Sequence, residues 1–130
     1  MKRSNKPLPG IEIISYGKYS GWESENKDLP SLEQLTDRIK AEKDMEFGMI
    51  VKIKKAKGRY INYCIEHPPF RDEHDHIVPP FSGEYQIRTN PARFFLGDSI
   101  ASPVKDKRGT WTLKILIDGK ILAQKRIEIL

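Results

Sequence analysis

The feature that most constrains the fold is the C-terminal segment Gly109–Leu130, GTWTLKILIDGKILAQKRIEIL. Two apolar runs flank Asp118-Gly119, a dipeptide typical of the two-residue turn of a β-hairpin. Before the turn, large apolar side chains occupy every second position, as on one face of a strand: Trp111, Leu113, Ile115 and Ile117. The segment therefore predicts an antiparallel hairpin with an apolar face, and hence an all-β domain. It indicates the fold class and leaves the function open.

The returning strand of this hairpin alternates less strictly. Lys125 has the same parity as the apolar residues around it and interrupts them: Ile121, Ala123, Ile127 and Ile129. We expect either a β-bulge near Gln124 or a partly exposed strand at this place.

Other segments rich in β-branched and aromatic residues predict further strands, and with the hairpin they give an antiparallel β-sandwich of about seven strands. Apolar side chains on both faces of the 59–66 segment predict a central, covered strand in which the Cys64 thiol is buried. Gly97-Asp98 is expected to turn the chain after a short apolar strand. The expected strands are Ile11–Tyr19, Met45–Lys54, Arg59–Glu66, Ser82–Thr89 and Arg93–Leu96.

The segment 32–40 supports two interpretations. Leu32, Leu35 and Ile39 have helical spacing, and Ser31 is placed to cap a short helix. Alternatively, residues 36–41 form a short edge strand. Aliphatic spacing over so few residues does not separate the two.

The length of 130 residues is that of a single domain. Residues 1–9 are polar with two prolines and predict a disordered arm, and residues 10–130 then form the β-sandwich domain. No apolar stretch is long enough for a signal peptide or a membrane span, so we expect a cytoplasmic protein with no membrane contact. Cys64 is the only cysteine, which excludes an intrachain disulfide.

The net charge of +5 is unevenly distributed. Residues 38–59 carry eight basic and three acidic side chains, whereas residues 66–84 carry one basic and five acidic. Because no aromatic-rich basic motif accompanies this charge, an ordinary solvated surface is favoured over a nucleic-acid site. A weak nucleic-acid surface, if there is one, would use the basic 52–59 face: Lys52, Lys54, Lys55, Lys57 and Arg59.

A histidine-bearing loop follows the 59–66 segment. In an extended chain His74 and His76 point the same way, and with His67 and nearby carboxylates they are candidate ligands for a divalent metal. The spacing matches no structural zinc motif, and a polar loop between two Pro-Pro pairs needs no metal to explain it. His67 has a second interpretation, in which its ring hydrogen-bonds a neighbouring loop and fixes its path.

The chain lacks the usual catalytic signatures. It has no phosphate-binding glycine loop, no nucleophile elbow and no Cys/His pair at a familiar spacing, so we expect no enzyme activity and no cofactor. We expect a protein-interaction module instead, with Trp22 as an exposed aromatic candidate, or a homodimer formed by pairing of edge strands. Any site is expected in the loops and edges, above all between Glu66 and Gly83.

Several short motifs, taken in order, resemble one family of bacterial proteins. They are Ser15–Tyr19, Met45–Gly48, Ile65–Pro69, Gly109–Trp111 and Asp118–Lys120. Together they are similar to the proteins grouped as domain of unknown function 3859, over nearly the whole chain. The resemblance implies an immunoglobulin-like sandwich. It implies no activity and no catalytic residues, because the family has no established function.

Overall fold

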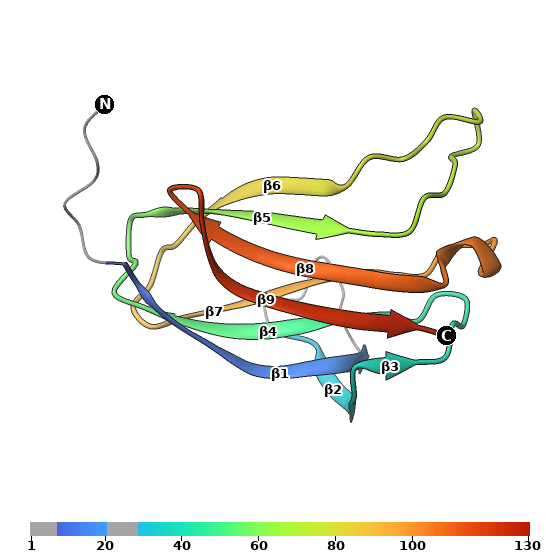
Figure 1. Ribbon diagram of the computed structural model, residues 1–130. Coiled ribbons are helices and arrows are strands. Elements are labelled where there is room, and N and C mark those ends of the chain that lie inside the picture. The colour runs from blue at the N-terminus through green and yellow to red at the C-terminus, as the bar shows by residue number, and fades with distance from the viewer. Residues whose placement is uncertain (1–7, 21–28) are drawn as a thin grey trace.

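The computed structural model describes residues 8–20 and 29–130, which form two β-sheets stacked face to face (Figure 1). The first sheet has the strand order β2-β1-β4-β7, and the second has the order β3-β9-β8-β5-β6. The predicted β-sandwich is therefore confirmed, with nine strands among the described residues. They are β1 Gly10–Ser20, β2 Ser31–Leu35, β3 Arg38–Ile39, β4 Glu46–Lys54, β5 Tyr60–Glu66, β6 Phe81–Gln86, β7 Ala92–Ser99, β8 Gly109–Ile117 and β9 Lys120–Ile129.

The core lies between the two sheets, and β4 and β8 contribute many of its buried side chains. Trp111 packs edge-on against Phe47, with ring centroids 5.1 Å apart, and its indole Nε1 donates to the carbonyl of Lys107 at 2.8 Å. Lys107 belongs to a single 3-10 turn, η1 (Lys105–Lys107), that precedes β8. The fully buried side chains of the two strands are Phe47, Met49, Val51, Ile53, Trp111, Leu113, Ile115 and Ile117.

The C-terminal hairpin is confirmed. Asp118 and Gly119 both have positive φ angles, 48° and 78°, as the tight turn requires. The expected bulge is present close to Gln124, between the pairs Ile115–Ala123 and Leu116–Ile121 and beside the turn. The short turn sets the register at this end, and the extra residue is taken up next to it.

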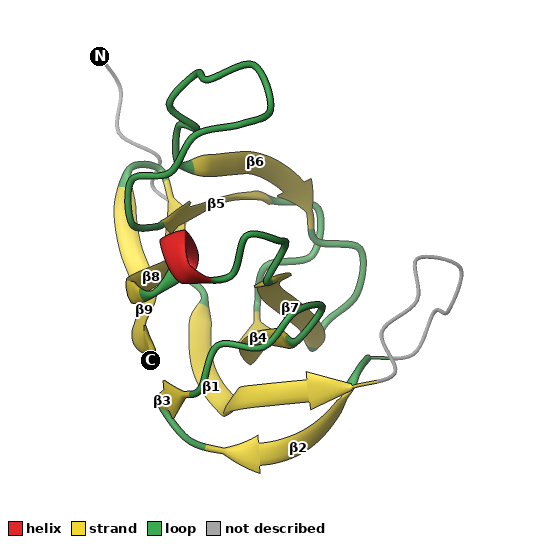
Figure 2. Ribbon diagram, turned by 90° about the vertical axis from the view of Figure 1, so that its right-hand side faces the viewer, coloured by secondary structure: helices red, strands yellow, loops and turns green. Residues whose placement is uncertain are grey.

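Lys125 faces inward and is partly exposed, as the second alternative predicted. Its ammonium lies 3.9 Å from the centroid of the Tyr16 ring on β1 and 3.8 Å from a carboxylate oxygen of Asp37. These partners compensate the charge at an inward position. They also close this side of the sandwich, where β1 meets β9 (Figure 2).

The segment 32–40 contains no helix, so that alternative was wrong. The β2 strand pairs with β1 at the edge of the first sheet, and β3 runs parallel to β9 at the edge of the second. The strand alternative holds only for Arg38–Ile39, where Ile39 is buried. The helical spacing misled because the chain here crosses from one sheet to the other and uses its apolar residues in separate pairings.

Two further expectations about strands were wrong. The outer face of β5 is not covered: Tyr60 is exposed, and Cys64 is only half-buried. Gly97-Asp98 does not turn the chain, because β7 continues through it to Ser99 in register with β4. Among the described residues, no helix has the length and apolarity to cross a membrane.

Candidate functional site

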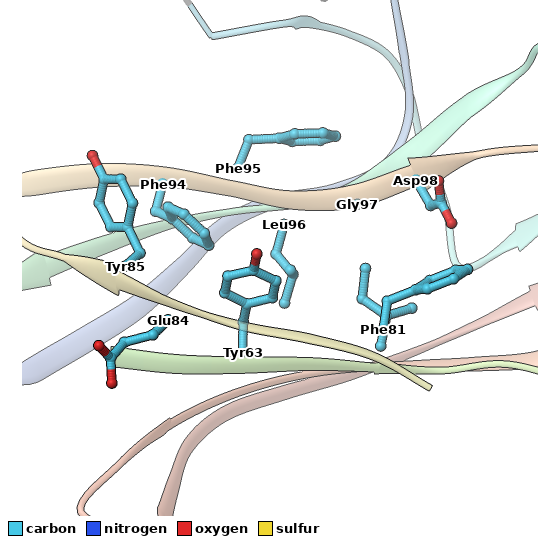
Figure 3. A pocket seen from close by; sticks show the side chains of 10 residues that line it. Tyr63, Phe81, Glu84, Tyr85, Phe94, Phe95, Leu96, Gly97 and Asp98 are labelled. Carbon is cyan, nitrogen blue, oxygen red and sulfur yellow. The ribbon is translucent and has the colours of Figure 1, made fainter. Parts of the chain in front are cut away.

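A groove opens on the side of the sandwich opposite Lys125, between the edge strands β6 and β7. Its volume is about 400 Å³, and aromatic side chains from both sheets supply much of its lining (Figure 3). Because β6 and β7 each end a sheet, neither strand closes over this gap in the described part of the chain. The lining residues are Tyr63, Ile65, Phe81, Glu84, Tyr85, Phe94, Phe95, Leu96, Gly97 and Asp98.

Strand register places the aromatic rings in the groove. Tyr63 on β5 faces Gly83 on β6, and a Cβ atom at Gly83 would lie 2.3 Å from the Tyr63 hydroxyl oxygen. The missing side chain at Gly83 therefore leaves room for the tyrosine ring to reach the groove. Phe94 on β7 lies between two tyrosines, with ring centroids 6.0 Å from Tyr63 and 5.0 Å from Tyr85.

Asp98 provides a carboxylate at the end of the groove near Phe81 (Figure 3). Burial raises the pKa of Asp98 above its usual value, because the ionised form loses water. A hydrogen bond from the Ser99 backbone N–H and the charge of His67 lower this pKa again, but by less than burial raises it. The carboxylate is thus incompletely compensated. Glu84, the other acid of the lining, points away from the rings (Figure 3).

His67 fixes the base of the loop between β5 and β6. Its Nδ1 lies 2.8 Å from the carbonyl of Pro68 and its Nε2 2.8 Å from the carbonyl of Pro79. The ring also packs against Phe70 and Phe81, with centroids 4.4 and 4.9 Å apart. The structure thus confirms the predicted hydrogen bond from His67 to a neighbouring loop. Both ring nitrogens thus lie within hydrogen-bond distance of carbonyl oxygens.

His74 and His76 lie at the exposed tip of that loop, with ring centroids 6.4 Å apart. Asp72 organises the tip, because its carboxylate accepts hydrogen bonds from both histidine backbone N–H groups at 2.9 and 3.0 Å. Within residues 8–20 and 29–130, no three His, Cys, Asp or Glu side chains are grouped to hold a metal ion. Metal binding at His67, His74 and His76 therefore stays a prediction.

The predicted basic face is divided among different parts of the sandwich. Lys52 lies on β4 directly opposite Glu12 of β1, while Arg59 forms a 3.1 Å ion pair with Asp118 of the C-terminal hairpin turn. The remaining lysines of the 52–59 face, Lys54, Lys55 and Lys57, are exposed at the end of β4 and in the turn after it. Trp22, the predicted aromatic contact, lies outside the described residues.

Sequence reasoning missed the groove. A site was expected between residues 66 and 83, and of the lining residues only Phe81 lies there. Gly83, at the end of that interval, lies next to the Tyr63 ring. One available signal was the pattern Phe-Ser-Gly-Glu-Tyr at 81–85, where a glycine stands between two aromatic residues of the same parity. That pattern indicates space on a strand face, although not what fills it.

Comparison with known proteins agrees with this architecture. The profile of the family described as domain of unknown function (DUF3859) matches residues 8–129. An immunoglobulin-like protein from Pseudomonas aeruginosa has a similar structure, with a TM-score of 0.74 and 16% sequence identity, over 92% of this chain and 96% of that chain. No curated protein matches the sequence. The predicted immunoglobulin-like fold is confirmed.

Proposed function

The chain belongs to the family of domain of unknown function 3859, whose description names no activity, and from its own geometry we propose that it is a non-enzymatic protein-interaction module. It binds an extended segment of another protein in the groove between β6 and β7. The observation that carries this proposal is the groove lined by Tyr63, Tyr85 and Phe94 at an open side of the sandwich.

The composition of the groove suits a protein ligand. Aromatic side chains are enriched at binding surfaces because they offer large contact areas at little conformational cost. Tyr85 is 41% exposed in the free protein, so covering it removes apolar surface from water. A volume of about 400 Å³ is enough for side chains rather than for a whole folded domain.

The strand edges beside the groove favour an extended ligand. In the described part of the chain, β6 pairs only with β5 and β7 pairs only with β4, so each has one edge without a strand partner. Such an edge can add a strand from another chain through main-chain hydrogen bonds, while pockets select alternate side chains. Neither β6 nor β7 contains a lysine, the residue that most often protects an exposed edge.

Selection from a library of random peptides displayed on phage tests the proposal. Peptides enriched on the immobilised wild-type protein are expected to bind Tyr85→Ala about tenfold or more weakly, since loss of a central aromatic contact typically costs this much. The matched control is Tyr60→Ala, which removes a tyrosine that is 52% exposed on the outer face of β5.

The control variant is expected to bind like the wild type. Failure to enrich any peptide, or enriched peptides that bind Tyr85→Ala and wild type equally, would reject the groove as the site. A concentration-dependent dimer that Tyr85→Ala abolishes would instead identify the occupant as a second copy of the chain, and would reject the proposed ligand.

A further inference from the structure

The two ends of the groove differ in chemistry. At one end the rings of Tyr85 and Phe94 form an apolar contact surface, and at the other Asp98 places a carboxylate near the ring of Phe81 (Figure 3). Two groups favour the ionised form of that carboxylate, the charge of His67 and the backbone N–H of Ser99. A ligand that enters this end therefore meets an anion bordered by aromatic faces.

The spacing of the two ends is set by β7. Phe94 and Asp98 lie four residues apart on the same strand and on the same face, as does Leu96 between them. At a rise of about 3.3 Å per residue, their Cα atoms are about 13 Å apart along the strand. An extended ligand running beside β7 has the same repeat, so its residues i and i+4 reach the two ends together. Its residue i+2 meets Tyr63 and Leu96, which line the groove between the two ends (Figure 3).

We propose that the groove, in the role of peptide site argued above, selects an apolar residue at its Phe94 end and an arginine or lysine four positions away at Asp98. The carboxylate supplies a charge-assisted hydrogen bond to the incoming cation. The aromatic face of Phe81 adds a cation–π contact, and a small residue in between avoids the Tyr63 ring. The inference rests on the proposed function and adds to it the class of ligand.

The experiment is a set of parallel selections from one random peptide library. The immobilised proteins are the wild type, Asp98→Asn and Glu12→Gln. The last is the control, because it removes an exposed carboxylate near the start of β1 that does not line the groove. Wild type and Glu12→Gln are expected to enrich arginine or lysine at the fourth position from an apolar residue. Asp98→Asn is expected to keep the apolar preference and lose the basic one.

One enriched peptide then serves as the probe in titrations. Replacement of its arginine by citrulline, which has nearly the same shape without the charge, is expected to weaken binding to the wild type about tenfold. The same replacement is expected to change binding to Asp98→Asn less than about twofold, because the charged pair no longer forms. Moving the arginine to position i+3 turns it to the opposite face and is expected to cost as much as the citrulline replacement.

The outcomes separate the two proposals. Peptides that depend on Tyr85 but show no basic preference would overturn this inference and leave the peptide-binding function standing. A basic preference that survives in Asp98→Asn would also overturn it, since the cation would then be bound elsewhere. Failure to enrich any peptide would overturn both.

Discussion

The ionised carboxylate of Asp98 destabilises the folded state, because it is partly buried. Burial raises its pKa, and this means that the ionised form is less stable in the folded protein than in the unfolded chain. A backbone N–H from Ser99 and the charge of His67 lower the pKa again, but by less than burial raises it. Residues that cost stability in a free protein are common where a ligand completes the interaction. The position of Asp98 in the groove is consistent with such a role.

Replacement of Asp98 by asparagine is expected to raise the free energy of unfolding near neutral pH. The ordinary pKa of 3.8 describes the unfolded chain, and the folded pKa lies above it. Between the two values the folded protein binds more protons, so stability falls as pH rises through this window. The gain from Asp98→Asn is therefore complete above the folded pKa and absent below 3.8. Urea unfolding of both proteins across acid and neutral pH measures it, and a variant less stable than wild type at neutral pH would show that the partners of the carboxylate stabilise its ionised form more than burial destabilises it.

Gly83 determines whether the Tyr63 ring can occupy the groove. Alanine at this position would place its Cβ 2.3 Å from the Tyr63 hydroxyl oxygen, so the ring must move. We expect Gly83→Ala to lower the free energy of unfolding by about 1–2 kcal/mol, in the range of overpacked sites. In a Tyr63→Ala background the same change is expected to cost much less, because the clashing ring is gone. Gly10→Ala, whose new Cβ has only an ordinary contact at 3.9 Å, is the control. Equal costs in both backgrounds would contradict the assignment.

At the level of strands, three glycines form a row across the first sheet. Gly17 of β1, Gly48 of β4 and Gly97 of β7 are direct neighbours in register. The rings of Tyr19 and Phe95 meet edge to face over the outer side of this sheet, with centroids 5.1 Å apart. A Cβ atom at Gly97 would lie 2.6 Å from the end of the Phe95 ring. The glycines thus let strands and rings approach closely where β7 leads to Asp98.

Gly48→Ala is expected to be among the most damaging single substitutions in the chain. Its Cβ would lie 2.3 Å from the carbonyl oxygen of Leu96 and 2.6 Å from the Cα atom of Gly97, and backbone atoms held in a ladder cannot move aside. We expect a loss of about 3 kcal/mol, the upper range for overpacking. Thermal and urea unfolding measure it against Gly10→Ala, which should change stability by less than about 1 kcal/mol. A cost as small as that of the control would mean that β4 and β7 separate easily.

For the molecule as a whole, the sequence predicted what depends on neighbouring residues. Alternation and turn residues identified the C-terminal hairpin and most strands, and ordered motifs indicated the family and its sandwich. Pairing between distant segments escaped prediction. Nothing local shows that β2 and β3 join different sheets, or that Gly97-Asp98 continues a strand. The groove was missed for the same reason, because β5, β6 and β7 contribute rings that lie together only after both sheets have formed.

The two sides of the sandwich therefore have different roles in stability. On one side Lys125, Tyr16 and Asp37 connect β9 to the first sheet. On the other, β6 borders the groove and, among the described strands, pairs with β5 alone. Strands with one partner and fewer buried contacts open more readily than central strands. We therefore expect the open side to accept the proposed ligand strand.

Amide hydrogen exchange measured by mass spectrometry tests this difference between the two sides. In the free protein we expect the amides of β6 to exchange faster than those of β8, which has β5 and β9 on either side. Addition of a peptide selected on the wild-type protein is expected to slow exchange in β6 and β7, because an added strand pairs with the edges that face no other strand in the described part of the chain. The β2 strand, an edge on the far side of the first sheet, is the internal control and should not change. Protection that appears equally in β2, or that is absent from both β6 and β7, would place the peptide elsewhere.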